Sequence, residues 1–319
     1  MTKRRGPPAA SFWRKGVEPD ESRVPQRPAL QVERLAEDIK EEEEDEEVVR
    51  CRVAAREEEL WLVSSDSKIY ARWCLQGATP MKRKAGVVLV PGYPEFGATM
   101  DSNLIVTIAD ACQRAGLPTL RFDYRGIGKS KGVFDAVDCV RDVVEAIRMA
   151  CGADGESGPF KSAAVVAFSF GSAQTIGNIY TKGVTHFISL SHGLGLSGTM
   201  PDGTRRPPSS ELKDDLLTQL YNRTNIFFTT LRITLPKLWI VGEEDVLTDK
   251  DELAKFLTQY SPGRGELSTL VTVPNANHDL RFKERSVANR IVSWLTDPKT
   301  KPIQFNLDFA SGPQTQTLS

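Results

Sequence analysis

The sequence has few of the residues on which metal and disulfide sites depend. Its 319 residues include five cysteines with no C-x-x-C pair. Neither a disulfide framework nor a zinc knuckle is therefore expected, and free thiols are typical of a reducing, cytoplasmic compartment. There are only three histidines, His186, His192 and His278, and no His, Asp and Glu cluster has metal-ligand spacing. We expect no metal and no cofactor.

A surplus of positive charge and long apolar runs are also absent. Lys and Arg total 41 and Asp and Glu 42, which argues against a dedicated nucleic-acid binder. The longest apolar runs, such as residues 163–168, fall far short of the ~20 residues that cross a bilayer, so no membrane span is predicted. The basic N-terminus lacks the apolar stretch of a secretory signal, and an organellar transit peptide stays open as an alternative to the cytoplasm.

Both ends of the chain are polar. Residues 1–56 are dense in charge and proline, and we predict a disordered or partly helical extension, with helical spacing of apolar residues in 31–40. The acidic run at 41–47 is interpreted as a solvating spacer, with docking of a protein partner as the alternative. Residues 298–319 are predicted to form a flexible tail.

Residues 57–297 are predicted to form one α/β domain. An antiparallel hairpin comes first, and short Val, Ile and Leu runs then alternate with helical stretches. This alternation indicates a mostly parallel sheet with helices on both faces. Residues 191–235 break the rhythm and are interpreted as a cap-like or lid-like insertion with a helix near 209–222. Predicted strands cover 59–64, 68–75, 86–90, 117–123, 162–168, 186–190, 236–241 and 268–273; predicted helices cover 102–115, 136–151, 172–180, 250–260 and 285–294.

Ser169 lies between a buried strand and a helix, in the sequence Ala167-Phe168-Ser169-Phe170-Gly171. This is the nucleophile-elbow pattern G-x-S-x-G with Ala in place of the first Gly. The flanking small residues let the strand and the helix approach each other around a strained serine. By itself the pentapeptide is weak support for a catalytic serine.

Two later strands provide an acid and a base. Asp245 follows the strand two after the serine, and His278 follows the last strand. Imidazole can take the serine proton and return it to a leaving group, while a carboxylate fixes the imidazole tautomer. Glu243, Glu244 and Asp249 are nearby alternatives to Asp245. His186 is interpreted as a core or edge residue, and His192 as a turn residue or a residue that lines the pocket.

The order serine, aspartate, histidine is that of α/β-hydrolases, and over about residues 57–297 the chain resembles that superfamily, closest to its small serine esterase-like members. Residues 121–130 resemble the family's D-x-R-G-x-G-x-S loop, which is mainly structural, so no catalytic role is assigned to Arg125. The loop is not a P-loop, because Asp123 occupies a glycine position, nor a dinucleotide fingerprint, because Lys131 does so. The resemblance implies an α/β-hydrolase fold.

The resemblance also implies an oxyanion hole. The family carries His-Gly after its third strand, whereas this chain has Pro91-Gly92. Since the donors are backbone N–H groups, those of Tyr93 and Phe170 are the candidates. Residues 97–103 resemble a G-G-x-M-D motif of one subgroup, with Ala98 in place of the second Gly.

We therefore expect a serine hydrolase that cleaves a small-molecule ester or related acyl bond through Ser169, His278 and Asp245. Two alternatives stay open. One is a catalytically inactive binding or scaffold protein on the same fold, which the missing His-Gly and the charged extension suggest. The other is an acyltransferase that uses the same three residues.

Overall fold

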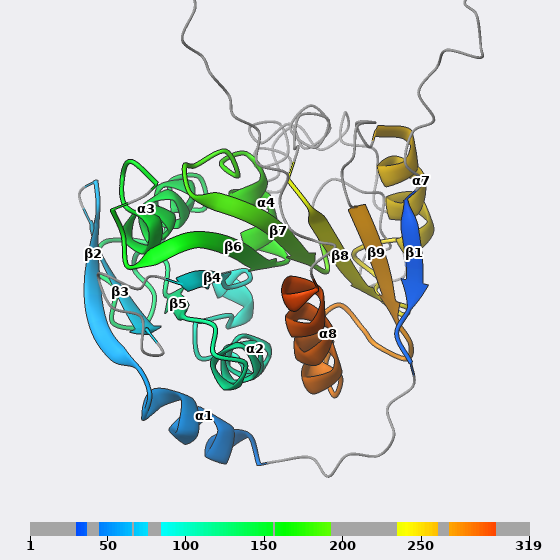
Figure 1. Ribbon diagram of the computed structural model, residues 1–319, viewed down its shortest axis with the longest axis horizontal. Coiled ribbons are helices and arrows are strands. Elements are labelled where there is room, and N and C mark those ends of the chain that lie inside the picture. Colours follow the sequence, from blue (N-terminus) through cyan, green and yellow to red (C-terminus); the bar gives the residue numbers. More distant parts are fainter. Residues whose placement is uncertain are drawn as a thin grey trace, which may run out of the picture.

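A nine-stranded sheet runs through the part of the chain that the computed structural model describes, which is residues 30–36, 45–65, 67–75, 84–155, 157–192, 235–260 and 268–297 (Figure 1). The strand order is β1-β9-β8-β7-β6-β4-β5-β3-β2. The strands are β1 (Gln31–Arg34), β2 (Glu58–Ser64), β3 (Ser67–Cys74), β4 (Lys84–Val90), β5 (Thr119–Phe122), β6 (Phe160–Phe168), β7 (Val184–Leu190), β8 (Lys237–Gly242) and β9 (Ser268–Val273).

The strands from β5 through β4 and β6 to β9 and β1 are parallel to one another. At the other end, β3 pairs with β5 antiparallel and forms an antiparallel hairpin with β2. The central strands are apolar almost throughout, because both of their faces are covered. The predicted fold class, a mostly parallel sheet with an N-terminal antiparallel hairpin, is confirmed.

Helices cover the two faces of the sheet (Figure 1). On one face, α3 (Cys139–Cys151), α4 (Phe170–Ile176) and α7 (Lys250–Tyr260) pack around residues such as Val143, Ala173 and Leu253. On the other face, α1 (Glu46–Ala54), α2 (Asn103–Arg114) and α8 (Glu284–Thr296) pack around residues such as Val53 and Ile108. Each helix carries an apolar stripe that this packing removes from water.

A buried ion pair joins the loop after β5 to helix α3. The Arg125 guanidinium donates to the Asp142 carboxylate at 2.8 Å, and the Arg125 backbone N–H donates to the same carboxylate at 3.0 Å. The Ser64 hydroxyl, at the end of β2, donates to it as well. Both charged side chains are at least 96% buried, so each depends on the other for its compensation. Arg125 therefore holds the loop in place, in agreement with the structural role expected for it.

Two segments of residues 1–56, predicted to be disordered or partly helical, have regular structure, and the first differs from the prediction. Residues 31–34 form β1, which pairs in parallel with β9, and not the expected helix. Residues 46–54 form α1, whose first N–H groups are capped by Asp45 and flanked by acidic side chains, a favourable placement at a helix N-terminus. Ion pairs dock the C-terminal half of α1, since Arg52 and Arg56 both contact the buried carboxylate of Asp110 on α2.

Several expectations fall on residues outside the described ranges. They concern residues 1–29 and 37–44, the insertion from 193 to 234 and the tail from 298 onward.

Candidate active site

Ser169 stands alone in a sharp turn between β6 and α4. Its backbone has φ 49° and ψ −112°, a region that residues with a side chain rarely occupy. The first turn of helix α4 packs directly against the loop that follows β4. A Cβ on Gly171 would lie 2.4 Å from the Pro91 carbonyl oxygen in that loop. Gly171 is therefore required sterically, as the pentapeptide pattern suggested, and the turn lifts the Ser169 hydroxyl beyond the end of the strand.

The structure brings the three predicted triad residues together. The Ser169 Oγ lies 2.8 Å from His278 Nε2, and His278 Nδ1 lies 3.0 Å from both carboxylate oxygens of Asp245. The loops that carry Asp245 and His278 touch through backbone groups, with the Glu244 N–H donating to the Ala276 carbonyl at 2.9 Å. A continuous hydrogen-bonded chain thus links hydroxyl, imidazole and carboxylate.

Two backbone groups that sequence reasoning missed hold the Asp245 carboxylate. The N–H groups of Leu247 and Thr248 donate to its Oδ1 at 2.8 and 2.9 Å. With the Asp245 side chain fully buried, these bonds keep it oriented toward His278. The signal was present in the sequence, since aspartate commonly accepts from the backbone two and three residues ahead in such turns.

The competing acids have other partners. Glu243 forms ion pairs with Arg34 on β1 and Lys250 on α7. Asp249 precedes α7, and its carboxylate accepts the Asp251 N–H at 2.9 Å. Glu244 is exposed. Asp245 is thus the acid that reaches His278.

The other two histidines lie apart from the triad. His186 is half-buried in β7 and packs against Trp294 of α8. His192, just after β7, is buried against Trp239, and its Nδ1 lies 3.0 Å from the Ser189 hydroxyl. Burial lowers the pKa of His192 to about 3, so its imidazole is neutral at physiological pH.

The two residues whose backbone N–H groups are the candidate oxyanion donors are in contact through their side chains. The rings of Tyr93 and Phe170 are 5.0 Å apart, and a Cβ on Gly92 would lie 2.7 Å from the Phe168 ring, so the loop after β4 packs closely against the serine turn. The Phe170 N–H is the first of helix α4 and has no partner within that helix. An oxygen bound beside Ser169 can accept from such a group.

The loop after β5 supports this edge of the site. Asp123 accepts the Met100 N–H at 2.8 Å, and the Ser130 hydroxyl donates to the Asp123 carbonyl. Gly128 lies so close to the Asp123 carboxylate that a Cβ would lie 2.4 Å from its oxygen. Burial raises the pKa of Asp123 to about 6. A hydrogen bond therefore joins the two segments that resemble family motifs, residues 97–103 and residues 121–130.

No group of three or more His, Cys, Asp or Glu side chains in the described ranges has a geometry that could hold a metal ion. Within the same residues, no helix combines the length and apolar character needed to cross a membrane.

No protein-family model and no curated protein sequence matches the chain. Solved structures do match. An α/β serine hydrolase homologue from Coxiella burnetii is 20% identical, with 75% of this chain and 97% of that chain covered and a TM-score of 0.53. The Pyrococcus furiosus esterase Pf2001 is 16% identical (84% and 98% covered, TM-score 0.59), and mouse α/β hydrolase domain-containing protein 10 is 16% identical (75% and 98%, 0.56). The chain has the α/β-hydrolase fold.

Proposed function

We propose that this protein is a serine hydrolase that cleaves an ester or related acyl bond. The observation that carries the proposal is the chain of hydrogen bonds from Ser169 through His278 to Asp245, with contacts of 2.8 and 3.0 Å. Solved esterases and serine hydrolases of the same fold add support.

Each residue has a defined part in the reaction. The Ser169 Oγ attacks the substrate carbonyl carbon while His278 Nε2 takes its proton. The carbonyl oxygen becomes an oxyanion, which accepts from the N–H groups of Tyr93 and Phe170. Protonated His278 then donates to the leaving alcohol, and the acyl group stays on Ser169. Water, deprotonated by His278, releases the acid.

Asp245 acts through His278. Its carboxylate accepts the Nδ1 proton, so Nε2 is the free base that faces Ser169, and its charge stabilises the imidazolium that forms. The reaction as written needs no metal or redox cofactor.

The test combines labelling with turnover. A fluorophosphonate probe is expected to add one group to the intact protein, on Ser169, and Ser169→Ala is expected to remain unlabelled. Turnover of short p-nitrophenyl esters is expected to fall by about 10⁴-fold in Asp245→Asn. The matched control, Asp249→Asn, removes a carboxylate from the same turn and is expected to retain turnover.

The opposite results would identify the alternatives. Folded protein that takes up no label and turns over no faster than Ser169→Ala would favour a binding protein on this fold. Acyl transfer to an added alcohol or thiol in preference to water would favour an acyltransferase.

A further inference from the structure

The strand at one end of the sheet, β2, has one edge that no other described strand covers. Among the described strands it pairs only with β3, and all seven of its residues pair without a shift in register. It contains no Pro or Gly, its two charged residues, Glu58 and Glu59, lie at one end, and Trp61 and Val63 are 44% and 67% exposed. An edge of this kind can pair with a further strand.

The strand at the other end, β1, is different. It has four residues, and both of its charged residues have partners on neighbouring elements. Glu33 pairs with Arg290 of α8 at 2.7 Å, and Arg34 pairs with Glu243 at 3.2 Å. Short length and fixed charges protect this edge, even though Val32 on it is 61% exposed.

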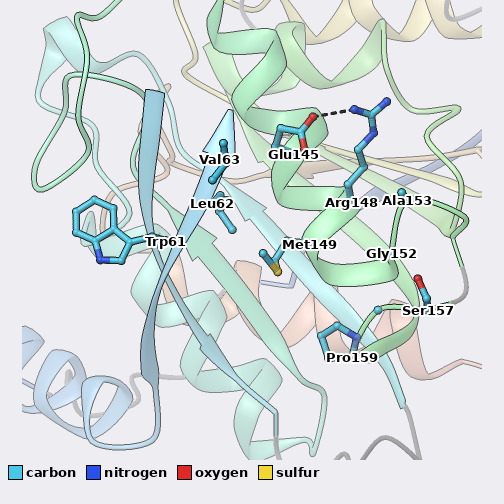
Figure 2. Close-up of a pocket in the computed structure, with 11 residues that line it drawn as sticks. Trp61, Leu62, Val63, Glu145, Arg148, Met149, Gly152, Ala153, Ser157 and Pro159 are labelled. Carbon is cyan, nitrogen blue, oxygen red and sulfur yellow. Dashed lines mark hydrogen bonds and ion pairs between the residues drawn. The ribbon is translucent and has the colours of Figure 1, made fainter. Parts of the chain in front are cut away.

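A groove of about 630 Å³ lies beside β2, between the strand and the C-terminal part of α3 (Figure 2). Leu62 and Met149 provide apolar surface inside it, and Glu145 and Arg148 of α3 are joined by a 2.7 Å ion pair at its side. Figure 2 shows Trp61 pointing away from α3. The groove contains no residue of the candidate active site.

We propose that β2 pairs with β2 of a second copy of this chain, antiparallel about a two-fold axis at Trp61. Because Trp61 is the middle residue of the strand, the two copies match over its full length. Leu60 then lies opposite Leu62, Glu59 opposite Val63 and Glu58 opposite Ser64 of the partner subunit. The sequence of β2 is thus self-complementary: apolar residues meet around the axis, and no two like charges are directly opposite.

The surroundings of β2 fit a second copy. A two-fold axis perpendicular to the joined sheet keeps the α3 helices of the two copies on the same side of it. Glu59 remains ionised, because hydrogen bonds from Tyr70 and Lys129 lower its pKa. The Glu59 carboxylate, which also contacts Lys129 at 3.1 Å and Arg72 at 3.7 Å, therefore faces position 63 of the partner subunit, where a second carboxylate would repel it. This interface does not depend on the proposed hydrolase activity.

Two substitutions of Val63 test the proposal, because the side chain is exposed. Within one subunit Val63 is opposite Lys68 of β3, which favours Glu over Lys at this position, so the opposite order in the dissociation constant reports on the second copy. Sedimentation equilibrium of the full chain is expected to show a monomer–dimer equilibrium. Val63→Glu places two carboxylates opposite Glu59 residues and is expected to raise the dissociation constant by about 10-fold. Val63→Lys, its matched control, places ammonium groups there and is expected to leave the dissociation constant unchanged or lower it.

Three results would overturn the proposal. The first is a monomer at all concentrations up to the solubility limit. The second is a dimer on which the two charges have the same effect. The third is a dimer that disappears when residues 298–319 are removed, because the C-terminal segment, and not β2 of the second copy, would then be the strand at this edge.

Discussion

Replacement of Ser169 by glycine and by alanine should reverse the usual order of stability. Both variants lose the hydroxyl and its 2.8 Å contact with His278, so they differ only in the Cβ. Alanine keeps that Cβ at φ 49° and ψ −112°, a conformation that costs about 1–3 kcal/mol. Glycine adopts it without strain, but its more flexible unfolded chain costs about 0.5–1 kcal/mol. The difference of these ranges is about 0–2.5 kcal/mol, so we expect Ser169→Gly to be more stable than Ser169→Ala by about 1 kcal/mol.

Urea denaturation followed by circular dichroism measures the difference, provided that the two variants share one m-value. Ser172, three residues later in α4, is the matched control, because its hydroxyl is also hydrogen bonded and its backbone is helical. There we expect the ordinary order, with Ser172→Gly about 1 kcal/mol less stable than Ser172→Ala. A Ser169→Gly variant that is also the less stable of its pair would refute the argument that strain is stored at Ser169.

Three further predictions concern other buried groups. Asp142→Asn should lower the free energy of unfolding by about 3–5 kcal/mol, because it leaves the Arg125 charge buried without its main partner. Asp138→Asn, whose more exposed carboxylate lies 3.6 Å from Arg125, should lower it by less than about 1 kcal/mol. Chemical denaturation of the two variants would compare these free energies. The native protein should react with one equivalent of a thiol reagent, at the exposed Cys51, and with five after unfolding; a second fast-reacting thiol would contradict the burial of the others. Burial raises the folded-state pKa of Asp123 to about 6, so its ionisation should destabilise the fold as pH rises from about 4 to 6. The stability of wild type relative to Asp123→Asn should therefore fall over that pH range. A difference between their melting temperatures that stays constant with pH would contradict this.

The mostly parallel sheet and the succession of its strands along the chain were predictable, because each central element has a strong local signal. The apolar runs at residues 86–90 and 162–168 correspond to β4 and β6, with ends that differ by at most two residues. Helix α3 begins at Cys139, three residues after the predicted start. Helix ends depend on single capping bonds and are therefore harder to predict than periodicity.

Helix α1 and strand β1 were missed for a different reason. Their local sequences are charged, and a high density of charge favours disorder. What orders them is contact with distant residues: Asp110 holds Arg52 and Arg56, and β9 offers β1 a backbone edge. Asp110 is 97% buried, so its charge needs these partners. The buried charge that requires compensation lies on α2, so the sequence of α1 by itself gives no sign of this contact.

The candidate site was predictable from the topology of the sheet. In a parallel sheet every strand ends at the same edge, so residues that follow β6, β8 and β9 must lie near one another whatever the intervening loops do. The order of Ser169, Asp245 and His278 was therefore sufficient to place them together. It was not sufficient to choose among the acids after β8. That choice depends on two backbone N–H groups, those of Leu247 and Thr248, which orient one carboxylate toward the imidazole, while Glu243 is held by charges on β1 and α7.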